Sequence, residues 1–172
     1  MSSEPVPSSS TDPASELPAK IEAPLTVGAQ IEARAQHPAF ANRVFAMHDD
    51  ARWTYADLRN QSVRMAHFLL ERLGPIDSDR PGHVAMILEN HLELISLFGG
   101  CAYGKLVLFG INTGLRGEVL AGVLNHSRAR VLVVDERFAQ EVDRIRGRLE
   151  HIQPEQILVL PTLGGEIEPE RD

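Results

Sequence analysis

The sequence has few of the features that assign a chain to a special class of protein. It holds a single cysteine, Cys101, which cannot form an internal disulfide and suits a reducing cytoplasm. No apolar run approaches the roughly 18 residues that a membrane-spanning helix needs. The first residues (MSSEPVPSSSTDPASELP) lack both the basic and the apolar segment of a secretory signal. We therefore expect a cytoplasmic protein without a transmembrane segment.

Positive charge is also scarce. The formal net charge is −7, and each end of the chain, residues 1–25 and residues 162–172, carries four acidic residues and one basic residue. The middle is therefore almost neutral, and it shows no basic patch of the kind that binds nucleic acid. We expect no nucleic-acid partner.

What remains is typical of a globular protein. The 172 residues are 43% hydrophobic and 24% charged, which predicts one domain with a sizeable core. Residues 1–25, rich in Ser, Pro, Glu and Ala, are predicted to be a disordered tail. Residues 162–172 (TLGGEIEPERD) are interpreted as a truncated polar end, which leaves residues 26–161 for the folded part.

Short apolar runs alternate with helical patterns through most of that part. Continuous apolar runs are typical of strands covered on both faces, and strands that alternate with helices predict a parallel sheet with right-handed crossovers. The fold class is therefore α/β, with a layered parallel sheet. The expected strands are 84–88 (VAMIL), 106–109 (LVLF), 131–134 (VLVV) and 157–160 (ILVL), and the expected helices are 91–104, about 116–126, and 136–150.

Residues 26–75 predict a different beginning. Thr26 is placed to cap a helix of about ten residues with Ile31 on its inner face, and 43–54 has the pattern of a small hairpin. Thr54 and Asp57 resemble a capping box. The helix that they open ends at Gly74-Pro75, and its predicted apolar face consists of Leu58, Met65, Ala66, Leu69, Leu70 and Leu73.

The helix predicted over 91–104 (HLELISLFGGCAYG) is apolar or small all the way round. Such a helix must be buried on several sides, so we expect more protein to cover it. Gly99, Gly100 and Gly104 are interpreted as allowing a close approach between helix and sheet. Cys101 is expected to be a core residue rather than a nucleophile.

Two segments invite a nucleotide-binding interpretation. Residues 110–117 (GINTGLRG) follow a strand and precede a helix, but the glycine spacing is one residue short of a P-loop and the segment has no Lys. We interpret it as a turn capped by Thr113 or a neighbour. Asp135 stands where an acid could bind a ribose, yet the preceding strand–helix turn, Glu89-Asn90-His91, is not a G-x-G-x-x-G. Asn90, with an acid three residues on, is interpreted as a helix start.

No other catalytic pattern is visible. The seven histidines show no ligand spacing, and His67, His91 and His126 are interpreted as local polar residues. Neither an H-E-x-x-H, a cysteine pair nor a G-x-S-x-G occurs. We therefore assign no catalytic, cofactor-binding or metal residue.

Four stretches, in the right order, resemble the adenylate-forming (AMP-binding) superfamily of acyl-CoA synthetases, luciferases and adenylation domains. The similarity covers about residues 26–161, and residues 111–118 are most similar to the long-chain fatty-acid and fatty-acid-transport members. The four stretches are 52–58 (RWTYADL), 83–93 (HVAMILENHLE), 100–112 (GCAYGKLVLFGIN) and 115–134 (LRGEVLAGVLNHSRARVLVV).

The resemblance implies an incomplete portion of the large N-terminal domain of an acyl-CoA synthetase. Members of the family use ATP and Mg²⁺ to turn a carboxylate into an acyl-adenylate, which CoA then converts to a thioester. The family's phosphate loop, Thr-Glu pair, ribose-binding Asp and late Lys have no counterpart here. The chain alone is thus expected to be inactive and to bind no cofactor. It is expected to need the remainder of a synthetase, from which a truncated or fragmentary reading frame would have separated it. The expected partners also include a second copy of the chain, as a homodimer.

Two other interpretations stay open. The chain could be a non-catalytic interaction module that uses the exposed side of 91–104, or a small nucleotide-binding protein that uses 110–117.

Overall fold

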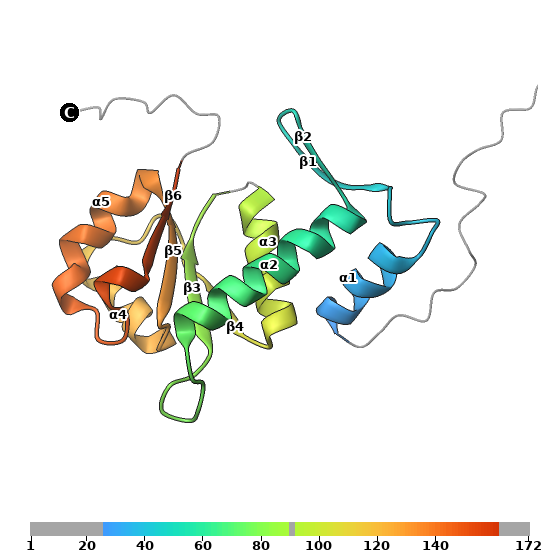
Figure 1. Ribbon diagram of the computed structural model, residues 1–172. Helices are drawn as coiled ribbons and strands as arrows, with labels where there is room; N and C mark the ends of the chain where they lie inside the picture. Colours follow the sequence, from blue (N-terminus) through green and yellow to red (C-terminus); the bar gives the residue numbers. More distant parts are fainter. Residues whose placement is uncertain (1–25, 90–91, 162–172) are drawn as a thin grey trace, which may run out of the picture.

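The computed structural model describes residues 26–89 and 92–161, so the predicted tails at 1–25 and 162–172 lie outside the described residues. A small hairpin leads into a layered α/β unit (Figure 1). The helices are α1 (Val27–Gln36), α2 (Tyr55–Leu73), α3 (Leu92–Gly104), α4 (Gly117–Ser127) and α5 (Glu136–Ile145). The strands are β1 (Val44–His48), β2 (Ala51–Thr54), β3 (His83–Ile87), β4 (Val107–Gly110), β5 (Val131–Asp135) and β6 (Ile157–Leu160).

The predicted parallel sheet is confirmed. Its order is β4-β3-β5-β6, and every neighbouring pair runs parallel. Helices α2 and α3 cover one face while α4 and α5 cover the other, and α1 and the hairpin lie at the far end of the molecule (Figure 1). The α/β fold class therefore holds as the alternating pattern predicts.

Each face of the sheet has its own apolar core. The face under α4 and α5 includes Leu120, Leu124, Val142 and Ile145, all buried. The face under α2 and α3 is covered by a second cluster of buried residues: Leu69, Leu73, Val84, Leu88, Leu97, Cys101, Val131 and Val133. Strand β5 is buried along its whole length. Apolar burial on both faces is the main stabilising contribution to such a fold.

The expectation that all four strands are covered on both faces is wrong at the two outer strands. Val107 in β4 is 48% exposed and Val159 in β6 is 50% exposed. The physical reason is position. The runs LVLF and ILVL are as apolar as the central strands, but they lie at the edges of the described sheet, where the helices do not reach over them completely.

The amino-terminal predictions hold in most details. The Thr26 Oγ1 accepts a hydrogen bond from the Ala29 N–H, and Ile31 is buried. The capping box is present, since Asp57 N–H donates to Thr54 Oγ1 (3.2 Å) and Thr54 N–H donates to Asp57 Oδ2 (2.9 Å). One apolar position is wrong: Leu70 is 38% exposed, because it lies at the margin of the buried stripe.

Gly99 and Gly100 of α3 allow a close approach to α2 rather than to the sheet, which corrects their interpretation. A Cβ at Gly99 would lie 2.0 Å from Ser62 Oγ, and a Cβ at Gly100 would lie 2.6 Å from Met65 Cγ. Both neighbours belong to α2. Gly104 faces Leu106, with Leu70 of α2 farther off. The two helices can therefore pack with their backbones unusually close.

The last predicted helix is shorter than expected. Helix α5 ends at Ile145 and is followed by a 3₁₀ turn, Arg146–Arg148, although the apolar stripe continues to a partly buried Leu149. Among the residues that the structure describes, no helix is long and apolar enough to cross a membrane.

Candidate functional site

The carboxyl edge of the sheet is the place where an open parallel sheet usually binds ligands. Adjacent strands β3 and β5 continue into helices on opposite faces, because α3 packs with the α2 side and α5 with the α4 side. Open α/β sheets usually bind ligands at such a reversal, outside the carboxyl ends of the strands. The described residues that meet there follow β3, β4 and β5.

An ion-pair network joins the carboxyl ends of β3 and β5. Arg137, in the first turn of α5, donates to Asp135 Oδ2 and to Glu89 Oε2, both at 2.7 Å. Asp135 is 2% exposed, and its Oδ1 also accepts the Arg137 N–H, so that it caps α5. The hydrogen bond that Arg137 donates to Asp135 is the largest cause that raises the pKa of Arg137 above its ordinary value. One cation is thus shared between two carboxylates.

The turn after β4 is occupied by its own polar groups. Asn112 Oδ1 accepts the Gly114 N–H at 2.7 Å, and the Arg116 guanidinium donates to the carbonyl oxygens of Thr113 and Leu115. Thr113 does not cap α4. The Gly117 N–H at the start of α4 instead donates to Glu141 Oε1 of α5 (2.9 Å), and this bond is the largest cause that lowers the pKa of Glu141.

These contacts decide what the carboxyl edge can do chemically. A helix N-terminus and an arginine are the usual means of holding a phosphate. Here a carboxylate already lies at the N-terminus of α4, while Arg116 and Arg137 are bound to groups of the protein itself. Activation of a carboxylate on the α-phosphate of ATP needs positive charge and backbone donors aimed at the reacting oxygens. Among the described residues, these three turns do not offer that arrangement.

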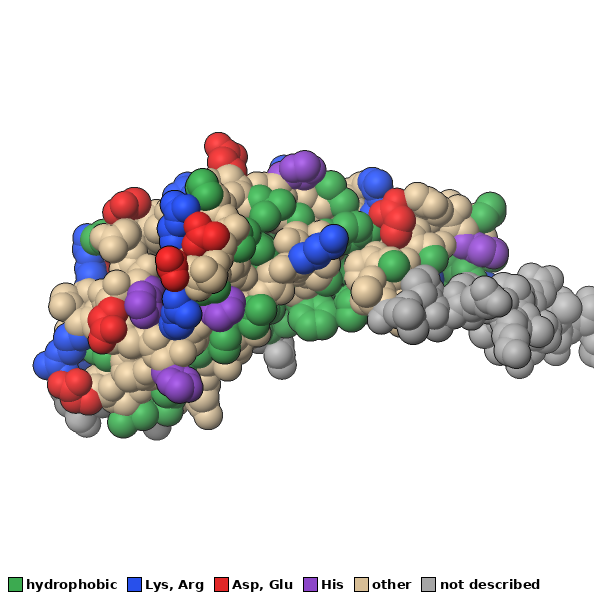
Figure 2. All heavy atoms as spheres, turned by 90° about the horizontal axis from the view of Figure 1, so that it is seen from below, with side chains coloured by type: hydrophobic (Ala, Val, Ile, Leu, Met, Phe, Trp, Pro, Cys, Tyr) green, Lys and Arg blue, Asp and Glu red, His purple; other side chains and the backbone are tan. Residues whose placement is uncertain are grey.

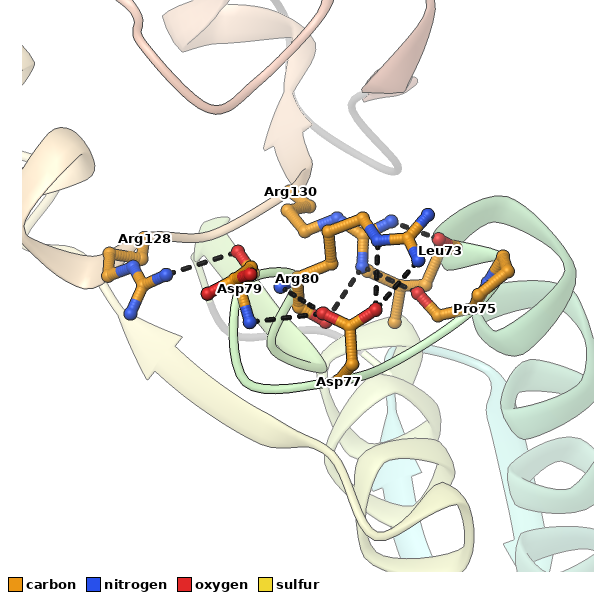
Figure 3. A network of polar contacts seen from close by, with 7 residues as sticks. All are labelled: Leu73, Pro75, Asp77, Asp79, Arg80, Arg128 and Arg130. Atoms are coloured by element: carbon orange, nitrogen blue, oxygen red, sulfur yellow. Dashed lines mark hydrogen bonds and ion pairs between the residues drawn. The ribbon is translucent and has the colours of Figure 1, made fainter.

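A second polar network ties the opposite edge of the sheet together (Figure 3). Arg130, just before β5, donates to the carbonyl oxygens of Leu73, Pro75 and Arg80, while Arg80 forms an ion pair with Asp77 at 2.7 Å. Arg130 therefore fixes the end of α2 and the loop that leads to β3. Viewed from this edge, charged side chains of both signs gather towards one end of the molecule, and hydrophobic ones lie towards its middle (Figure 2).

A third network joins the first three helices. Glu32 of α1 accepts hydrogen bonds from Arg59 of α2 (3.0 Å) and from the Tyr103 hydroxyl of α3 (2.7 Å). The bond to Arg59, followed by that to Tyr103, lowers the pKa of Glu32 below its ordinary value. Burial raises the pKa of Tyr103. The network explains how α1 is held, and its groups satisfy one another.

Most of the residues that the sequence singles out are structural. Cys101 is 3% exposed, and burial raises the pKa of its thiol to about 12, which leaves it unreactive as a nucleophile. His67 and His126 are exposed. Asp135 does lie at the carboxyl end of β5, but as a helix cap. Asn90 and His91 lie outside the described residues.

Arg137 and Glu141 belong to none of the motifs recognised in the sequence. An acid directly after a buried strand, with an arginine two positions later, is a signal that could have found Arg137. Glu141 had no such signal, because its partner is 24 residues away.

Comparison with known proteins gives a consistent relationship. The AMP-binding enzyme family matches residues 28–170. The 4-hydroxybutyrate–CoA ligase 2 of Metallosphaera sedula is 26% identical over 110 residues, which cover 64% of this chain and 19% of that protein. The long-chain-fatty-acid–CoA ligase FadD13 of Mycobacterium tuberculosis is 32% identical over 99 residues, or 58% of this chain and 19% of that protein.

Solved structures agree with the sequence match. The anthranilate CoA ligase AuaEII, in complex with anthranoyl-AMP, superposes with a TM-score of 0.67 at 27% identity, over 80% of this chain and 25% of that one. The N-terminal domain of FACL13 from Mycobacterium tuberculosis gives 0.64 at 26% identity, over 80% of this chain and 33% of that one. The chain thus spans about a fifth of the length of these curated relatives. With most of its residues matched, the chain belongs to the AMP-binding enzyme family.

Proposed function

We propose that this chain supplies scaffold to the N-terminal domain of an AMP-forming acyl-CoA synthetase and performs no chemistry alone. Residues 26–161 would form part of the AMP-binding domain. The complete enzyme would use ATP and Mg²⁺ to convert a carboxylic acid to an acyl-adenylate, and CoA to convert that to a thioester. The proposed partners are the remainder of a synthetase polypeptide and a second copy of this chain, in the cytoplasm.

The pairing of charges at the carboxyl edge carries this proposal. Arg137 is neutralised by Asp135 and Glu89, and the N-terminus of α4 holds Glu141. To bind a nucleoside triphosphate there, the chain would have to break these pairs and bring phosphate close to three carboxylates. The repulsion between the negative phosphate and the negative carboxylates opposes binding. The cationic groups that the reaction needs would therefore come from segments that these residues do not include.

For the substrate of the complete enzyme we propose a fatty acid. The support is the 32% identity to FadD13, a long-chain-fatty-acid–CoA ligase. The anthranilate CoA ligase and the 4-hydroxybutyrate–CoA ligase among the similar proteins carry other acids in their names. The choice of acyl chain is therefore the part of the proposal that needs the complete enzyme for its test.

The experiment that tests the scaffold role is a titration of the purified chain with ATP and Mg²⁺, followed by thermal unfolding. A ligand that binds the folded state raises the midpoint of unfolding by mass action. We expect no shift at millimolar ATP. A saturable shift that Arg116→Gln removes would instead support the nucleotide-binding alternative at 110–117. Reading the nucleotide sequence after codon 172 for a phosphate loop, in any frame, tests the link to a larger synthetase.

A further inference from the structure

The outer strand β6 presents an unprotected apolar edge. Within the described residues, β6 pairs only with β5, in a register that runs from Leu132↔Ile157 to Asp135↔Leu160. Its four residues are Ile, Leu, Val and Leu, without a charge, a proline or a glycine. Proteins usually protect such an edge with a lysine, a proline or a bulge, since its free N–H and C=O groups attract another strand.

An apolar groove lies beside this edge on the α2 face of the sheet. Met65 and Phe68 of α2 line one side of it, and Leu158 and Leu160 line the other. Phe68 is 39% exposed, and the two leucines are only partly buried against the core of that face. A strand added to β6 would lay side chains over these four residues and remove their apolar surface from water, which is favourable.

The charges on the rim favour a second copy of the chain as the occupant. Arg72 and Glu155 are the two ionisable residues that line the groove, so it has no net charge to repel an identical molecule. A two-fold axis brings the same patch of both molecules together and pairs identical strands in antiparallel fashion. Because all four residues of β6 are apolar, such a pairing places an apolar residue opposite another apolar residue at every position.

We infer that two copies of this chain associate through β6, by antiparallel pairing that joins their sheets and covers the groove at Phe68. This inference names the surface for the homodimer of the proposed function and does not depend on the proposed enzymology.

Sedimentation of the complete 172-residue chain over a range of concentrations tests the inference, with two variants of matched exposure. Val159→Lys places a charge at the β6 edge, where the side chain is 50% exposed, and Val107→Lys does the same at the β4 edge, where it is 48% exposed. We expect a monomer–dimer equilibrium whose dissociation constant rises by about tenfold or more in Val159→Lys. Val107→Lys should leave it unchanged.

Hydrogen exchange of the unmodified chain gives a second readout that needs no variant. The backbone amides of 157–160 should exchange more slowly as the concentration rises, while those of 107–110 should not change. A chain that is monomeric at all concentrations would overturn the inference, as would a dimer that is indifferent to Val159→Lys or protected at 107–110. Absence of this pairing would leave the proposed scaffold role untouched, because the titration with ATP and Mg²⁺ tests that role separately.

Discussion

At the scale of single residues, the missing side chain at Gly99 lets α3 approach α2 closely at Ser62. The Cβ of any other side chain at position 99 would lie 2.0 Å from Ser62 Oγ and 2.8 Å from Ser62 Cβ. Ser62 is fully buried, so it has no space into which to move. A larger residue at position 99 would therefore force the two helices apart.

Gly99→Ala should lower the free energy of unfolding by about 1–3 kcal/mol, the usual cost of overpacking a core. Gly122→Ala in α4 is the matched control, since a Cβ there meets nothing within 4 Å and alanine favours a helix. Urea unfolding of both variants measures the difference. Adding Ser62→Gly to Gly99→Ala should recover part of the loss, and a double variant as unstable as the sum of its parts would contradict the steric account.

Glu32 gives the molecule a predictable response to acid. Arg59 and then Tyr103 lower its pKa below the ordinary value of 4.5 in the folded state. A lowered carboxylate pKa stabilises the fold above the unfolded-state pKa, and this contribution is lost as pH falls through the folded-state pKa. Glu32→Gln should therefore be less stable than the parent at pH 7, with the difference shrinking below pH 4.5. A gap in unfolding free energy that stays constant from neutral to acid pH would contradict it.

At the scale of elements, Arg130 connects parts of the chain that are far apart in sequence. Its guanidinium binds three carbonyl oxygens, at the end of α2 and in the loop before β3 (Figure 3). The backbone at Gly74, where α2 ends, has a φ of 61°, which glycine adopts without strain. Gly74 thus ends α2, and Arg130 ties that end to the loop before β3.

Arg130→Met should cost about 1–3 kcal/mol of unfolding free energy, because it removes the donor from the partly buried carbonyl oxygen of Leu73. Arg146→Met is the control. Arg146 reaches Asp143 only at 4.0 Å on the surface, and such pairs contribute less than about 1 kcal/mol. Chemical denaturation of both variants makes the comparison. Equal stability of the two would show that Arg130 does not fix this junction.

Local signals in the sequence predict most of these elements. The caps at Thr26 and Thr54 and the four apolar runs locate helices and strands to within a few residues. What local signals do not contain is the choice of neighbour. That Gly99 meets a helix rather than the sheet, that β4 and β6 are outer strands, and that Glu141 caps α4 all depend on contacts distant in sequence. The same limit hid the part of Glu89 in the Arg137 network, since Glu89 lies 48 residues from its partner.

At the scale of the whole molecule, the fold belongs to a family of much longer chains. When the two are superposed, the matched region covers 80% of this chain but 33% of the FACL13 N-terminal domain. A layered sheet with paired charges at its carboxyl edge can position other segments without supplying reactive groups. The proposed scaffold role follows from the shared fold together with the paired charges at the carboxyl ends of the strands.

The most direct test is a measurement of pyrophosphate release by the purified chain, with ATP, Mg²⁺, CoA and a panel of fatty and aromatic carboxylic acids. FadD13 serves as the positive control. We expect release no greater than in the absence of protein for every acid. Turnover that scales with the concentration of the chain, and that yields AMP and an acyl thioester, would contradict the account.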